Sequence, residues 1–86
     1  MEKSNILSRV ARKETINKLP LVEILGQHRV LIENHRGVMG YSLEEIQIKV
    51  SYGKITVSGT GLRFIQINKE QLVITGNIDA VVLRGR

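Results

Sequence analysis

The chain contains two histidines, His28 and His35, which stand seven residues apart and carry its only imidazole groups. A zinc site needs three or four ligands in a fitting geometry, and the chain has no Cys. The carboxylates of the chain do not stand at a recognised ligand spacing from either histidine. We therefore interpret both histidines as surface or turn residues and predict that the protein binds no metal and no other cofactor.

The sequence also lacks a motif for hydrolysis or for phosphoryl transfer. A serine nucleophile needs a base within hydrogen-bond reach, and no short motif joins a serine of this chain to a histidine. Gly59-Thr60-Gly61 is rich in glycine, but the Gly, Lys and helix that a phosphate-binding loop requires do not follow it. We interpret it as a turn and Glu44-Glu45 as a solvated pair. The sequence therefore predicts a protein that is not an enzyme.

The stretch Ile32–Gly37 is the most polar and individual part of the chain after residue 18. Asn34 and Gly37 both tolerate positive φ, which is typical of a solvated hairpin loop. Exposed loops on a rigid scaffold also carry binding, so a partner-recognition loop is the second interpretation. Its candidate contact residues are Glu33, Asn34, His35 and Arg36.

The first part of the chain, residues 1–18, holds five basic and two acidic residues, whereas residues 19–86 hold eight basic and six acidic ones. Ile6, Leu7 and Val10 follow at helical spacing, but an isolated helix of two turns is marginal in water. Two interpretations stay open: a frayed terminus, or a segment that makes weak contact with a membrane surface or a partner. The candidate contact residues here are Arg9, Arg12, Lys13 and Lys18.

The basic first part of the chain, which we call the leader, ends before Leu19-Pro20, because the residue before a proline is pushed to extended geometry. We predict two parts: a basic leader over residues 1–18, helical or disordered, and a single β domain over residues 19–86. The formal net charge of the whole chain is +5. Since the basic residues after residue 18 are interspersed with acidic ones and aromatics are few, a small nucleic-acid-binding module is only the runner-up function.

The elements after Pro20 read as strands. Eleven Ile and nine Val are stiff at χ1 and favour a pleated, half-buried surface. Apolar and polar residues alternate in short runs, which glycine- and asparagine-containing turns separate. We predict an all-β protein, a small β-sandwich of seven or eight short, mostly antiparallel strands. Strand-glycine repeats at 54–59 and 71–76 leave a short β-solenoid or roll as the alternative.

The alternation also predicts which side chains are buried and where the strands are irregular. The phase slips after Phe64 and near Ala80, so we expect a β-bulge or a strand that bends from one layer to the other. At least one of Gly53, Gly59 and Gly76 should hold positive φ. The predicted core is Ile24, Val30, Ile32, Ile46, Ile48, Val50, Ile55, Val57, Leu62, Phe64, Leu72 and Ile74.

Several pieces of the chain fall in the order of one known family: Leu19-Pro20, Gly26, Ile32–Gly37, Tyr41-Ser42 with Glu44-Glu45, Tyr52–Gly59 and Glu70–Ile78. On these pieces the chain resembles the YabP/YqfC family of sporulation proteins, in particular its YqfC branch, over about residues 19–83. The resemblance implies a small β-sandwich protein of endospore-forming bacteria without known catalytic residues.

The resemblance also implies a cellular location and binding partners. The location would be the mother-cell cytoplasm, including a peripheral position at the outer forespore membrane. The partners would be other sporulation proteins, among them the membrane protein YqfD. We therefore expect a non-enzymatic protein that acts through protein–protein contacts during spore formation, and we leave homo-oligomerisation open.

Overall fold

Residues 19–85 are described by the computed structural model, and they form six β-strands. The strands are β1 (Leu21–Leu25), β2 (Arg29–Glu33), β3 (Val38–Tyr41), β4 (Glu45–Val50), β5 (Gly53–Ile67) and β6 (Gln71–Gly85). All neighbours pair antiparallel in one sheet of order β1-β2-β6-β5-β4-β3. The all-β class is confirmed. The antiparallel pairing excludes the stacked coils of a solenoid for this part of the chain.

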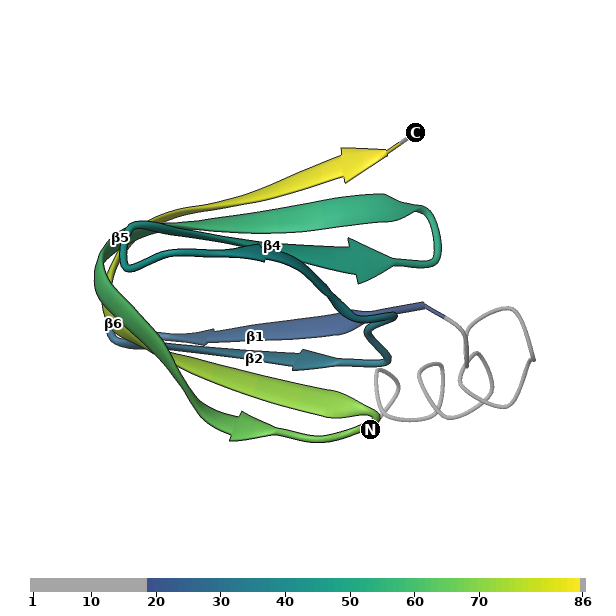
Figure 1. Ribbon diagram of the computed structural model, residues 1–86, viewed down its shortest axis with the longest axis horizontal. Coiled ribbons are helices and arrows are strands. Elements are labelled where there is room, and N and C mark those ends of the chain that lie inside the picture. Colours follow the sequence, from purple (N-terminus) through teal and green to yellow (C-terminus); the bar gives the residue numbers. More distant parts are fainter. Residues whose placement is uncertain (1–18, 86) are drawn as a thin grey trace, which may run out of the picture.

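The sheet folds over on itself through its two long strands. Figure 1 shows β5 and β6 curving at one end of the molecule, so that β1 and β2 belong to one layer and β4 to the other. The first half of β5 pairs with β4 and with the end of β6, and the start of β6 pairs with β2. A single sheet thus supplies both layers of a sandwich.

The expected number of seven or eight short strands was wrong for a physical reason. Leu62–Phe64 continues β5 and Ile78–Leu83 continues β6, because bulges carry each strand through the bend without ending it. The register shifts lie between Ser58 and Gly59, Thr60 and Arg63, and Phe64 and Gln66. Both predicted phase slips therefore mark irregular pairing within long strands.

Glycines make the bend sterically accessible. Gly76 has φ of 144°, which confirms the prediction of positive φ at one of the three glycines named. A Cβ at Gly76 would also lie 2.9 Å from Gly61 O. Gly59 keeps ordinary φ, but a Cβ there would overlap Asn77 O, so it is the close approach of two backbones that requires glycine.

The core lies between the two layers, on what we call the inner face of the sheet; the opposite side is its outer face. Its buried members are aliphatic and come from every strand except β1 and β3: Val30, Ile32, Ile46, Ile48, Val50, Ile55, Val57, Leu62, Leu72, Ile74 and Ile78. Val73 is buried as well, but on the outer face.

Most of the predicted core is confirmed, and two members need correction. Ile24 is 54% exposed, because β1 is an edge strand of the described sheet and has a neighbouring strand on one side only. Phe64 is only half-buried; its ring packs against the Tyr41 ring with centroids 5.4 Å apart. Val73 and Ile78 were missed. Val73 lies on the outer face, where alternation predicts exposure.

The residues outside the described part include the leader. The expected helix or disorder of residues 1–18, and their boundary with the β domain, stay predictions. Within residues 19–85, the structure contains no helix with the length and apolar character needed to cross a membrane.

Candidate functional site

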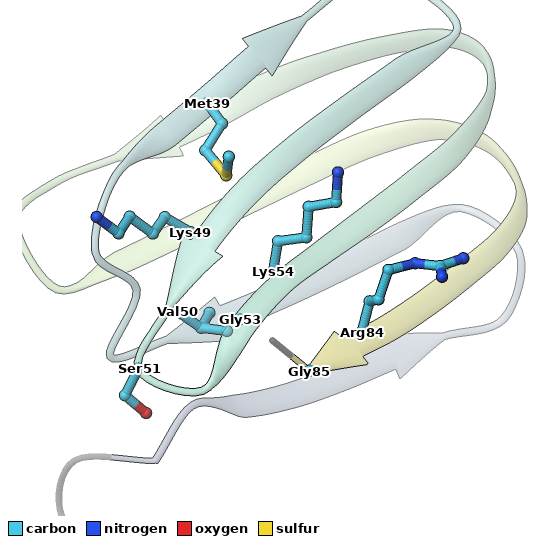
Figure 2. A pocket seen from close by; sticks show the side chains of 8 residues that line it. All are labelled: Met39, Lys49, Val50, Ser51, Gly53, Lys54, Arg84 and Gly85. Atoms are coloured by element: carbon cyan, nitrogen blue, oxygen red, sulfur yellow. The ribbon is translucent and has the colours of Figure 1, made fainter.

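The outer face of the layer formed by β4, β5 and β6 carries three basic side chains in a line. The register pairs Lys49 with Lys54, and Lys54 with Arg84. Because directly paired residues of antiparallel strands point to the same side of a sheet, the three cations share one face. Figure 2 shows them rising from three neighbouring strands. We call these three residues the basic row.

An open hollow of about 350 Å³ lies along this row. Met39, which sits at the register shift of β3, is 55% exposed and lines the hollow beside Lys49 (Figure 2). The tight turn between β4 and β5 lines it too, where a Cβ at Gly53 would overlap Arg84 O. The lining is Met39, Lys49, Val50, Ser51, Gly53, Lys54, Arg84 and Gly85.

Hydrogen bonds within the molecule only partly compensate the positive charge of the basic row. Lys54, the half-buried central member, donates from Nζ to the neutral Gln47 Oε1 at 3.3 Å. Gln47 in turn donates from Nε2 to Glu45 Oε2 at 2.9 Å. Lys49 and Arg84 are exposed to solvent. The surface is therefore cationic, with a methionine and aliphatic stems beside the charges, and suits an acidic ligand with some apolar character.

The polar stretch singled out in the sequence forms the end of β2 and its connection to β3. The expected hairpin was wrong, because β2 and β3 are not paired in the sheet. Much of the polarity of this stretch serves the fold. Asn34 has φ of 65°, and its Nδ2 donates to Leu19 O at 2.9 Å. Its backbone N–H donates to Glu70 O at 2.7 Å. Gln71 Nε2 donates to Glu33 Oε2 at 3.3 Å.

His35 ties the same connection to the turn between β5 and β6. Gly37 N–H donates to His35 Nδ1 at 3.0 Å, which leaves Nε2 as the nitrogen that donates to Asn68 O at 2.8 Å. Both ring nitrogens are therefore occupied by backbone groups. A role of these residues in partner contact stays a prediction; the structure shows that Asn34 and His35 also position the loop.

Arg36 connects this loop with the basic row. Its backbone N–H donates to Lys49 O at 2.7 Å, while Lys49 N–H donates to Gly37 O at 2.8 Å. Arg36 itself is exposed. The fold thus brings the end of the predicted contact loop next to the first residue of the row.

Sequence reasoning missed the row itself. Lys49 and Lys54 looked like members of a dispersed basic set, and Arg84 stands 30 residues from Lys54. Only the pairing of β6 with the first half of β5 brings Arg84 beside Lys54. The signal available was a basic residue at a non-core position in each of three strands, which gains meaning only when the strand order is known.

The other predicted chemistry adds no second site. Over residues 19–85, no group of three metal-ligating side chains gathers. Arg9, Arg12, Lys13 and Lys18 lie outside the described residues. The fold and this surface together define a small all-β domain whose distinctive chemistry lies on an exposed sheet face.

Comparison with known proteins gives the family. The model of the YabP family matches residues 17–86, so the chain belongs to this family. The chain is also 32% identical over 63 residues to the uncharacterized protein YqfC of Bacillus subtilis strain 168, which covers 73% of this chain and 68% of that protein. No solved structure matches it. It is therefore a sporulation-associated protein, and its family is not a known enzyme family.

Proposed function

We propose that the protein acts in the mother cell during spore formation as a non-enzymatic contact protein, with the basic row as the centre of its contact surface. One observation carries this proposal: three cations occupy directly paired positions on three adjacent strands. Like charges directly opposite one another disfavour a sheet. A row of this kind works against folding and is expected where an acidic partner meets it.

The partner we propose is an acidic, partly apolar segment of a membrane protein. Met39 beside the row offers a polarizable apolar contact, and Lys49, Lys54 and Arg84 offer the charge. Arg36 is exposed, and its backbone N–H donates to Lys49 O, so a further cation stands next to the first residue of the row in the chain fold. The family resemblance suggests the sporulation membrane protein YqfD as this partner. The protein would then work at the outer forespore membrane, from the cytoplasmic side of the mother cell.

The basic leader adds a second, weaker contact in this proposal. Five basic residues in 1–18 are attracted to an anionic membrane by up to about 1 kcal/mol each when they lie near its surface. Deleting residues 1–18 should leave the circular dichroism of the β domain unchanged and weaken recruitment of a fluorescent fusion to the forespore membrane. Equal localisation of the full-length and shortened fusions would remove the leader from the proposal.

Co-purification of YqfD with the tagged full-length protein from sporulating cells tests the main contact. The variant Lys49→Gln/Lys54→Gln/Arg84→Gln should lose most of the recovered YqfD. The matched control Arg29→Gln/Arg63→Gln removes two exposed cations from the outer face of the other layer and should keep it. Undiminished recovery with the row variant, or equal loss with the control, would contradict the proposal.

A further inference from the structure

Among residues 19–85, the later part of β6 has a neighbouring strand on one side only. β2 pairs with β6 over Gln71–Thr75, while β5 pairs with β6 along nearly its whole length. From Ala80 to Gly85, the strand therefore presents, at the margin of its layer, one row of backbone groups that pair with no strand of the described residues (Figure 1). An edge of this kind is a template for pairing with another chain.

The other edges of the described sheet carry features that hinder such pairing. Pro20 stands directly before β1, and β3 contains a register shift between Val38 and Gly40. The later half of β5 contains shifts on both sides of Arg63. Bulges and prolines at edges are known devices against edge-to-edge association. Ala80–Gly85, in contrast, pairs with Gly53–Ser58 in unbroken register and contains neither.

Apart from Arg84 on the outer face, the side chains of this segment are apolar. Val82 is 40% exposed on the outer face. Leu83 is paired with the buried Ile55 and so lies on the inner face, yet it is 58% exposed because none of the six described strands continues the sheet beyond it. The inner, apolar face of the sheet is thus left open along this edge.

We propose that a second copy of this chain covers the edge, its own Ala80–Gly85 segment pairing antiparallel with the first about a two-fold axis at Val82. This register places Val81 opposite Leu83 of the second copy, two apolar side chains that both extend the inner face. It places Arg84 opposite Ala80, whose side chain is a single methyl group, and keeps the two arginines apart. The segment is therefore complementary to itself, as an isologous interface requires.

The consequence is one continuous sheet that joins the two copies. Their two basic rows lie on the same outer face, since antiparallel neighbours keep the faces of a sheet aligned. Pairing at this edge does not depend on the contact proposed for the row, and purified protein alone tests it.

Analytical ultracentrifugation of the full-length protein should show a reversible dimer. Val82→Lys places two like charges directly opposite each other and should raise the dimer dissociation constant about tenfold or more. The matched control is Val38→Lys, since Val38 is also 40% exposed and lies on β3, the other edge of the same layer. A monomeric wild type, an unaffected Val82→Lys dimer, or equal weakening by Val38→Lys would overturn the proposal.

Disulfide trapping gives a second readout that does not rely on weakening. Because the chain has no Cys, Val82→Cys introduces a single thiol. Cross-strand neighbours in a sheet lie about 4.5–5.5 Å apart at Cβ, close enough for mild oxidation to link the two copies. Val82→Cys should form a covalent dimer much faster than Val38→Cys; equal rates would contradict the proposed register.

Discussion

Two rows of side chains cross the outer face of the sheet, one in each layer, and they differ in how closely their positive charges are spaced. In one layer Lys49, Lys54 and Arg84 follow one another on adjacent strands. In the other layer Arg29 and Arg63 both pair with Thr75, which stands between them. In this second row, strand β6 separates the two cations, whereas the three cations of the basic row lie on directly adjacent strands.

The residues around the two rows also differ in whether their pairing stabilises the sheet. Beside Thr75, the second layer packs Leu31 against Val73, and Val73 is only 9% exposed although it lies on the outer face. Thr75 Oγ1 also donates to His28 O at 3.1 Å. The second outer face is thus built from pairs that stabilise the sheet, whereas the first contains pairs that oppose it. The outer face of this fold thus carries cations in a separated arrangement in one layer and in a contiguous arrangement in the other.

We expect the largest effect on stability from a substitution in the core, which lies between the two layers. Ile48→Ala removes a side chain with 0% exposure and should lower the free energy of unfolding by about 2–5 kcal/mol. Ile24→Ala, at a position 54% exposed, should lower it by less than about 1 kcal/mol. Urea unfolding of both variants measures the difference. Equal losses would show that the inner face has been assigned wrongly.

An intermediate effect comes from making the second row like the first. Thr75→Lys would place a cation between Arg29 and Arg63 and remove the hydrogen bond to His28 O, so unfolding should become easier by about 1–2 kcal/mol. Thr56→Lys is the matched control, because Thr56 is half-buried and pairs with the neutral Gln47 and Val82. If both variants lose the same stability, contiguous charge is not the cause.

The smallest effect should have the opposite sign. Lys54→Gln removes the central cation of the basic row and should raise the free energy of unfolding by about 0.2–1 kcal/mol at low salt. The gain should shrink at high salt, where exposed charges are screened. Arg29→Gln, which relieves no directly paired cation, should bring no gain. A Lys54→Gln protein less stable than the wild type at every salt concentration would argue against the electrostatic cost.

The sequence allowed much of the fold to be predicted, because alternation of apolar and polar residues reports which face of a strand is buried. The method failed where neighbouring strands decide exposure. Ile24 has the right phase for burial but lies in an edge strand, and Val73 has the wrong phase but is covered by its neighbours. The phase slips near Phe64 and Ala80 were visible, but the continuity of β5 and β6 through them depends on contacts far apart in the chain.

The candidate site was less accessible from the sequence. Asn34 and Gly37 correctly indicated a turn-like backbone, since both have positive φ, but not that Asn34 and His35 bond to distant backbone groups. The basic row depends on two strand pairings, and alternation along one strand carries no information about which strand lies beside it.

Site-specific photo-crosslinking in sporulating cells tests most directly whether the outer face with the basic row meets the partner. A photo-reactive residue at Met39, which is 55% exposed beside the row, should give a covalent adduct with YqfD. The same residue at Leu25, 68% exposed and paired with Arg29 in the other layer, should give none. Adding Lys54→Gln should reduce the adduct from position 39. A YqfD adduct from position 25 with none from position 39 would contradict the account.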